Sequence, residues 1–105
     1  MVYCAISISK ARQLLHLKDY LPGGLLREIQ IYEVSVSRTY KEGIKYSCYL
    51  VDPKNGVGII GYDIRPGKGH HRHIRGRETK YVFQGLEKLL DDFALDVRRV
   101  LEGEL

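Results

Sequence analysis

Residues 85–102 place the strongest constraint on the fold, because their apolar side chains recur every three or four positions. The apolar stripe consists of Leu86, Leu89, Leu90, Phe93, Val97, Val100 and Leu101. Glu87 lies in an early turn and Arg98 and Arg99 in the last one, so these charges complement the helix dipole. Gly103 follows as a natural stop. The sequence therefore predicts an amphipathic helix over residues 85–102.

Turn-forming residues divide the rest of the chain into segments of about ten to twenty residues, the rhythm of an antiparallel meander. Glycine, proline and asparagine mark these turns at 22–24, 41–43, 52–56, 66–69 and 76. Between two of them, residues 44–50 alternate apolar and polar side chains, which predicts a strand with one buried face. The next strand is predicted over residues 57–62. The hairpin signal Asn55-Gly56 joins it to the strand at residues 44–50.

The N-terminal third is compatible with two structures. Positions 2–8 alternate as in a strand, whereas the apolar side chains of residues 11–18 fit one face of a helix equally well. We favour a strand after residue 11, because the turn at 22–24 then closes a hairpin with residues 25–37.

The segment 25–37 is rich in β-branched side chains, but its apolar phase shifts along the segment, which predicts a β-bulge near Ile31. Residues 80–83 are expected to add a further short strand. A chain of 105 residues is long enough for one domain and too short for a second core. We therefore predict a single α+β domain over residues 1–105: an antiparallel sheet of four to six strands with the amphipathic helix packed on one face.

Composition points to a soluble cytoplasmic protein. The apolar runs fall well short of the ~20 residues that a membrane span needs, and the first ten residues lack the pattern of a signal peptide. Cys4 and Cys48 are too far apart for a paired-thiolate metal motif, and a reducing cytosol disfavours a disulfide between them. Both are expected to be small buried hydrophobic residues.

The formal net charge of +4 is concentrated in one segment. Residues 63–80 hold six Lys or Arg residues against two Asp or Glu residues, so the rest of the chain is neutral. Three of the four histidines lie in the same segment, after a glycine-rich turn. We predict a basic, His-rich loop over residues 63–79 at one edge of the sheet. Such a patch is typical of a surface that meets phosphate, and histidine is well suited to move protons near neutral pH.

One interpretation of this segment is a metal-independent ribonuclease. In an extended chain, His71 and His73 point to the same side, where one imidazole abstracts a ribose 2′-hydroxyl proton and the other protonates the leaving oxygen. Asp63 or Tyr62 then orients one ring. The candidate phosphate-binding residues are Lys68, Arg72, Arg75 and Arg77. The supporting positions are Tyr62, His70 and Tyr81.

Two other interpretations remain open. A metal-dependent hydrolase would use His71, His73 and Asp63 as an open site for zinc, nickel or iron, although the surrounding cations repel a divalent ion. Our preferred interpretation has no metal and no other cofactor. The segment is otherwise a solvated basic surface that binds nucleic acid or an acidic protein without catalysis. The glycines do not form a nucleotide-binding loop, because the Gly-x-x-x-x-Gly-Lys-Ser/Thr spacing is absent.

The order of motifs in the second half of the chain is uncommon. Tyr62-Asp63 ends a strand, a Gly-Lys-Gly-His turn and the pair His71-x-His73 follow, and Tyr81-x-Phe83 leads into a helix with Leu89-Leu90 and Asp92-Phe93. Over residues 44–100 this order resembles the TumE family of toxin-antitoxin proteins. The chain departs from the family at Ile64, where members often carry asparagine.

The resemblance implies a small toxin that a helix-turn-helix antitoxin binds and neutralises. It also implies that Asp63, His71 and His73 are the positions most important for function. Action on RNA is expected by analogy with other small toxins and from the basic histidine cluster. A homodimer through the sheet edge near residues 80–83 is a further expectation.

Overall fold

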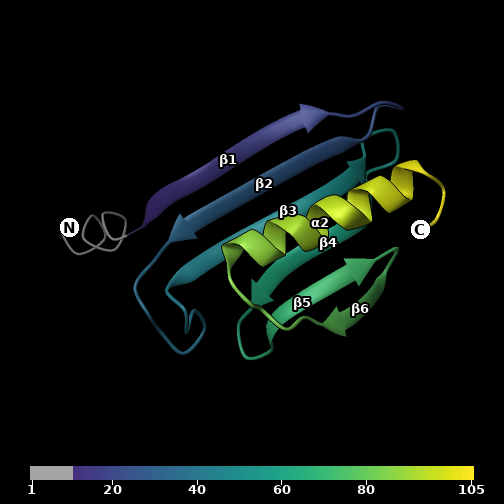
Figure 1. The fold of residues 1–105 in the computed structure, drawn as a ribbon. Coiled ribbons are helices and arrows are strands. Elements are labelled where there is room, and N and C mark those ends of the chain that lie inside the picture. The colour runs from purple at the N-terminus through teal and green to yellow at the C-terminus, as the bar shows by residue number, and fades with distance from the viewer. Residues whose placement is uncertain (1–10) are drawn as a thin grey trace.

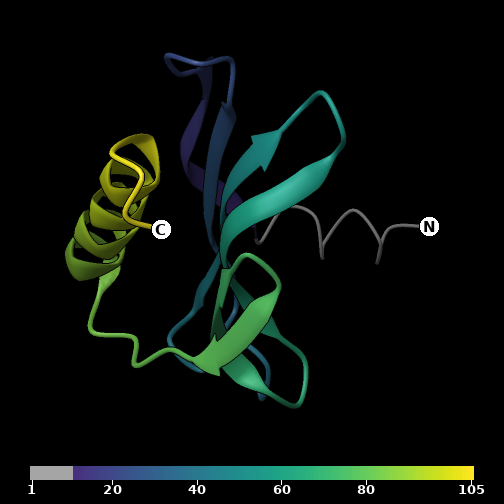
Figure 2. The same ribbon diagram turned by 90° about the vertical axis from the view of Figure 1, so that its right-hand side faces the viewer.

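The computed structural model describes residues 11–105, in which one antiparallel sheet carries one helix on one of its faces (Figures 1 and 2). Along the chain the elements are β1 (Arg12–Tyr20), β2 (Leu26–Glu33), β3 (Ile44–Asp52), β4 (Val57–Arg65), β5 (Gly69–Ile74), β6 (Arg77–Lys80) and α2 (Leu86–Leu101). The six strands lie side by side in sequence order. The predicted α+β fold, an antiparallel sheet of four to six strands with a C-terminal helix on one face, is confirmed.

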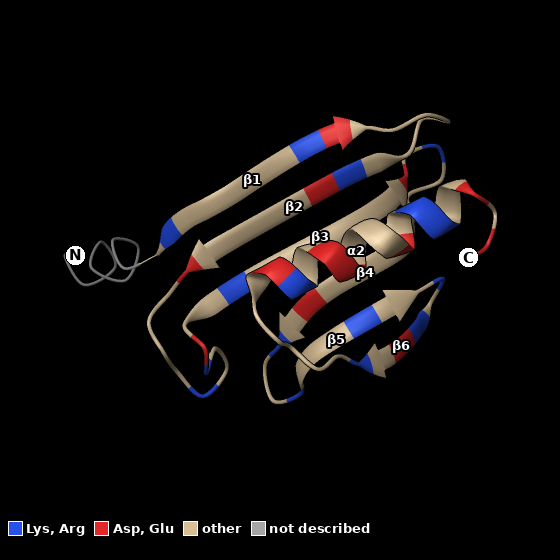
Figure 3. Cartoon of the chain, in the orientation of Figure 1, with Lys and Arg blue, Asp and Glu red and all other residues tan. Residues whose placement is uncertain are grey.

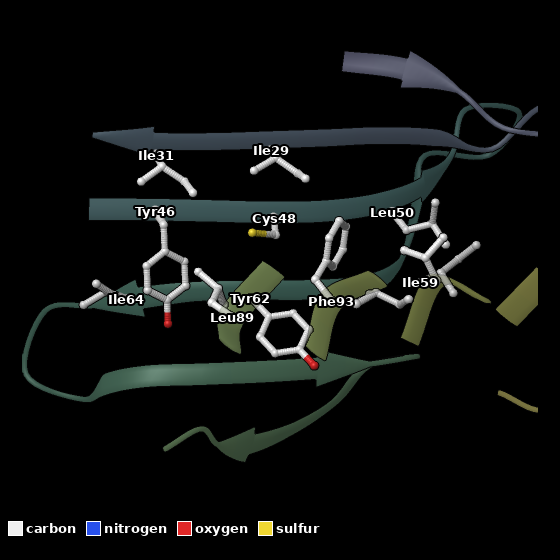
Figure 4. Close-up of a cluster of buried hydrophobic side chains, with 12 residues drawn as sticks. Ile29, Ile31, Tyr46, Cys48, Leu50, Ile59, Tyr62, Ile64, Leu89 and Phe93 are labelled. Carbon is white, nitrogen blue, oxygen red and sulfur yellow. The ribbon is translucent and has the colours of Figure 1, made fainter. Parts of the chain in front are cut away.

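The hydrophobic core lies between α2 and the covered face of the sheet (Figure 4). Phe93 is 1% exposed and packs edge-on against Tyr62, with ring centroids 6.0 Å apart. Cys48 is fully buried on the neighbouring strand, and burial raises the pKa of its thiol to about 12. This confirms Cys48 as a small buried hydrophobic residue, whereas Cys4 lies outside the described residues.

The favoured strand after residue 11 is confirmed as β1, which pairs with β2 through the turn at residues 22–24. Gly23 and Gly24 both adopt positive φ angles there, a conformation that other residues rarely accept. The hairpin between β3 and β4 is confirmed as well, with Gly56 at φ 71°. The alternation at positions 2–8 lies outside the described residues.

The predicted bulge near Ile31 lies in the neighbouring strand. β2 keeps a continuous register with β3, whereas the pairing of β1 with β2 shifts between Gln13 and Leu15, opposite Ile31. The apolar phase changes along residues 25–37 because β2 ends at Glu33, and the residues after it form the loop to β3. Val36 in this loop is 73% exposed.

The prediction of a loop over residues 63–79 is wrong. β4 continues to Arg65, and β5 and β6 extend the sheet by a hairpin whose turn contains Gly76 at φ 84°. The segment was mistaken for a loop because its strands carry histidine and charged side chains in place of an apolar alternation. Residues 80–83 are not the last strand either, because β6 ends at Lys80 and the chain then leaves the sheet for the helix.

The helix agrees with its predicted limits to one residue at each end. Gly85 at φ 102° precedes its first turn, and the backbone N–H of Glu102 donates to the carbonyl of Arg98 at its end. Gly103 follows at φ 76° as the predicted stop. Within residues 11–105 no helix has both the length and the apolar character needed to cross a membrane.

Replacement of Phe93 by alanine is expected to lower the free energy of unfolding by about 3–5 kcal/mol, because it removes a fully buried ring from between sheet and helix. Urea unfolding followed by circular dichroism measures the change. Leu101→Ala is the matched control, since this side chain lies on the same helix but is 44% exposed, and its loss is expected to cost less than about 1 kcal/mol. Equal stability of the Phe93→Ala protein and the wild type would contradict the core assignment.

Candidate functional site

The histidines of β5 lie on both faces of the sheet, because successive side chains of a strand alternate. Arg72 reaches α2, so the face covered by the helix holds Arg72 and His70. His71 and His73 lie on the opposite face, which we call the open face. Asp63 is the cross-strand neighbour of His71 in β4, and Glu78 is that of His73 in β6, so both share the open face.

His71 has an acceptor at each ring nitrogen. Its Nδ1 lies 3.0 Å from the carbonyl oxygen of Gly69, and its Nε2 lies 3.3 Å from a carboxylate oxygen of Glu78. An imidazole that carries a proton on both nitrogens satisfies both acceptors. The His71 side chain is only 9% exposed.

His73 faces a donor. The Nη2 atom of Arg65 lies 3.3 Å from His73 Nε2, and because a guanidinium can only donate, this nitrogen presents its lone pair. His73 also lines a pocket of about 290 Å³ on the open face, together with Asp63, Arg65 and Tyr49. The pocket exists because Gly61 lies opposite His73 in β4 and contributes no side chain.

Asp63 has an unsatisfied carboxylate oxygen in the same pocket. Its Oδ1 atom is shielded from solvent and makes no hydrogen bond with any described residue, and Arg65 Nε lies 3.8 Å away. Shielded carboxylate oxygens normally accept at least one hydrogen bond. Asp63 therefore has hydrogen-bonding capacity that the described residues do not use, at an oxygen that is shielded from solvent. Neither Asp63 nor Tyr62 makes a hydrogen bond that orients His71 or His73.

Glu78 and Arg65 are the residues of this site that the sequence did not single out. One carboxylate oxygen of Glu78 contacts His71, and the other lies 3.9 Å from Arg65 Nη1. Arg65 lies between three members of the site, since it also contacts Asp63 and His73. The signal for Glu78 was the turn at Gly76, because a hairpin there places Glu78 beside His73.

Arg72 and Tyr62 belong to a buried network under the helix. The Nε and Nη2 atoms of Arg72 lie 2.9 and 2.8 Å from the two carboxylate oxygens of Asp96, and the Tyr62 hydroxyl donates to the same carboxylate. The hydrogen bond with Asp96 is the main cause that raises the pKa of Arg72. Burial raises the pKa of Tyr62 above its usual range, so its hydroxyl stays protonated. These contacts join the sheet to α2.

His70 and Tyr81 also lie on the covered side. His70 stacks on Phe83, with ring centroids 4.7 Å apart, and its Nδ1 lies 2.8 Å from the Tyr46 hydroxyl. The Tyr81 hydroxyl donates to Asp92 on α2. Burial raises the pKa of Tyr81 well above its usual range, so this group is a donor and not a base at neutral pH. All three predicted supporting residues, Tyr62, His70 and Tyr81, therefore face away from His71 and His73.

The predicted phosphate-binding residues do not form one surface. Lys68 lies in the turn between β4 and β5, whereas Arg75 and Arg77 lie at the opposite end of β5. The Nη2 atom of Arg75 donates to the backbone carbonyl of Leu105. Arg72 faces the helix. Figure 3 shows this separation, with basic positions in the turn before β5, in the middle of β5, and in and beside β6.

The side chains proposed as metal ligands are not arranged as a ligand set. Within residues 11–105, no three His, Cys, Asp or Glu side chains are grouped so that they could hold a metal ion. Arg65 lies among His73, Asp63 and Glu78, where its positive charge opposes a divalent cation.

A family model described as Toxin TumE matches residues 9–101, nearly the whole chain. The match includes all six strands and the helix, and thus every residue of the open-face site. No match was found among curated proteins or among solved structures.

Substitution of Arg72 by alanine is expected to reduce the free energy of unfolding by about 2–3 kcal/mol, because it leaves the Asp96 carboxylate, 3% exposed, without its charged partner. Chemical denaturation measures the loss. Arg77→Ala removes an equal charge from the exposed strand β6 and is expected to change stability by less than about 0.5 kcal/mol. If the two variants were equally stable, the structural role of Arg72 would be refuted.

Proposed function

Since the chain belongs to the TumE toxin family and is thereby the toxin of a toxin-antitoxin system, we propose that it inhibits growth by cleaving RNA without a metal ion. The observation that carries this proposal is the pocket on the open face. There His73 lies beside the guanidinium of Arg65, and Asp63, whose Oδ1 atom has no hydrogen-bond partner among residues 11–105, lines the same pocket. His71 lies on the same strand and face. These residues supply a base, a cation and an acid, the groups that phosphodiester transfer needs.

In the proposed reaction His73 is the general base. The lone pair of Nε2 accepts the proton of the ribose 2′-hydroxyl after the substrate phosphate has drawn Arg65 away from this nitrogen. The 2′-oxygen then forms a bond with phosphorus, and the bond from phosphorus to the 5′-oxygen breaks. Arg65 stabilises the additional negative charge on the phosphoryl oxygens. The products are a 2′,3′-cyclic phosphate and a free 5′-hydroxyl.

His71 supplies the proton of the leaving 5′-oxygen. In the free protein a carboxylate oxygen of Glu78 lies 3.3 Å from Nε2 of His71, and the RNA phosphate group displaces this carboxylate to reach the ring. Asp63 accepts a hydrogen bond from the ribose with its Oδ1 atom, which has no partner among residues 11–105 and which becomes accessible when Arg65 moves to the phosphate. Arg75 and Arg77 remain predicted contacts to RNA beyond the pocket.

The proposal predicts that His71→Ala and His73→Ala each reduce RNA cleavage by at least about a hundredfold, the usual contribution of a general acid or base. Cleavage of a labelled oligoribonucleotide in the presence of chelator measures the rate, and growth after induction measures toxicity. His16→Ala is the matched control, because His16 is a solvent-exposed histidine of β1 that also contacts a glutamate. Full toxicity of a protein lacking both His71 and His73 would exclude catalysis by this pair.

A pocket-filling variant tests the same site without removing a catalytic group. Gly61 has no positive φ angle, and a Cβ atom there would lie 3.7 Å from atoms of His73 and Tyr49, an ordinary contact distance. Gly61→Ala should therefore fold normally, whereas Gly61→Leu should fill the pocket and block cleavage. The second candidate function is a basic module that binds RNA without catalysis. It would be favoured if the wild type never cleaved RNA and the Gly61→Leu protein bound RNA with unchanged affinity.

The family implies an antitoxin partner, and we propose that this partner is a helix-turn-helix protein encoded next to the toxin gene. Co-expression of that neighbouring gene product should restore growth and yield a complex that elutes as one peak in size-exclusion chromatography. Growth inhibition that persists in the presence of every adjacent gene product would count against it. A cytoplasmic location and a homodimer through β6, an exposed edge strand, stay predictions.

A further inference from the structure

A second basic site lies at the end of the sheet next to the open-face pocket. The loop between β2 and β3 runs beside the turn between β4 and β5 (Figures 1 and 2), and a groove of about 470 Å³ separates them. Its walls carry Arg38 and Lys41 from the loop and Lys68 from the turn. Arg65 lines both this groove and the pocket that contains His73. Cations from two distant segments therefore meet around one concave surface.

The cations of the groove are available to a ligand. Arg38, Lys41 and Lys68 are exposed, and among residues 11–105 none of them has an acidic partner within 4.0 Å. The one carboxylate in the lining is that of Glu42, which contacts Nε2 of His70 at 3.1 Å. Four cations and one anion thus surround the groove, which makes it attractive to a polyanion.

The loop that carries Arg38 and Lys41 is held in place. Its backbone is closed by hydrogen bonds from Ser37 N to the Tyr40 carbonyl and from Val34 N to the Gly43 carbonyl, at 3.1 and 2.8 Å. His70 ties it to β5, because the Tyr46 hydroxyl lies at one ring nitrogen and Glu42 at the other. Burial raises the pKa of Tyr46 well above its usual range, so this hydroxyl donates to Nδ1 and leaves the Nε2 proton for Glu42.

We propose that this groove binds the phosphodiester backbone of the RNA strand next to the cleaved bond. The inference rests on the proposed function, since it extends the substrate beyond the pocket of His73. Arg65 is shared by both cavities, so a strand whose reacting phosphate lies in the pocket passes into the groove with its next phosphates. Lysine and arginine side chains on exposed stems suit a repeated phosphate chain, which is read by charge and not by sequence.

A triple variant, Arg38→Ala with Lys41→Ala and Lys68→Ala, tests the proposal. The matched control removes three exposed cations from other parts of the structure: Lys18, Lys54 and Arg98. Both triple variants are made in a protein that also carries His71→Ala and His73→Ala, so that a fluorescent twelve-nucleotide single-stranded RNA stays intact during the titration. The groove variant should bind about tenfold more weakly or worse, and its dependence of log Kd on log salt should be smaller by ~2, the value for three phosphate contacts. The control variant should bind the RNA more tightly than the groove variant does, and its Kd should depend more steeply on salt.

The second measurement separates the groove from the pocket. With both histidines present, cleavage of a dinucleoside monophosphate should be unaffected by the groove substitutions, whereas KM for the twelve-nucleotide RNA should rise. Equal RNA affinity of the groove variant and its control would overturn the inference even if His73-dependent cleavage holds. If the wild type never cleaves RNA, the proposed function fails, and a selective affinity loss in the groove variant would still support backbone binding. Loss of antitoxin binding with unchanged RNA affinity would assign the groove to a protein partner and refute the proposal.

Discussion

The carboxylate of Asp96 is the interaction on which the arrangement of this protein depends. It is buried under the helix, where an unpaired charge would cost several kcal/mol, and it is stabilised by the hydroxyl of Tyr62 and two nitrogens of Arg72. Arg72 lies in the middle of β5. Because its side chain is held against α2, it determines which side chains of β5 point toward the helix and which point away from it. Because neighbours in a strand point to opposite sides, His71 and His73 are then directed away from the helix.

This orientation gives the two faces of the sheet different chemistry. On the covered face, burial raises the pKa values of Tyr46, Tyr62 and Tyr81, so their hydroxyl groups donate hydrogen bonds and do not accept protons near neutral pH. On the open face, the imidazoles contact an arginine and a glutamate that water can reach. The side chains of the proposed reaction therefore lie on the open face, and those of the covered face hold the helix.

The parts of the fold that could be predicted from the sequence are those whose burial follows hydrophobicity. The apolar side chains of β3 and α2 recur with clear periods of 2 and 3.6 residues. Asn55-Gly56 indicates the hairpin between β3 and β4 without any tertiary information. β5 has no such pattern, because its inward positions include His70 and Arg72, two polar residues that are satisfied only by partners far along the chain. Sequence periodicity cannot reveal a polar side chain that is buried in this way.

The same limitation applied to the site. Alternation correctly separated His71 and His73 from His70, but it gave no indication that Arg65 and Glu78 complete their surroundings. These contacts depend on which strands pair, and the pairing of β5 with β6 was hidden by their polar composition. A site that is assembled by strand register therefore becomes visible only when the strands themselves are known.

The concentration of charge along the chain is not a concentration of charge in space. Arg72 is neutralised by Asp96, and Arg75 and Arg77 lie at the far end of their hairpin from Lys68. Lys68 instead lines the groove together with Arg38 and Lys41. The segment of these two residues does not stand out in the sequence as basic, because Glu42 follows them. Glu42 orders the loop through its contact with His70, and its single negative charge offsets only part of the positive charge around the groove. His70, which faces away from the pocket, thus helps to form the basic groove. Of three adjacent residues in β5, His70 contacts the loop, His71 lies on the open face and Arg72 contacts the helix.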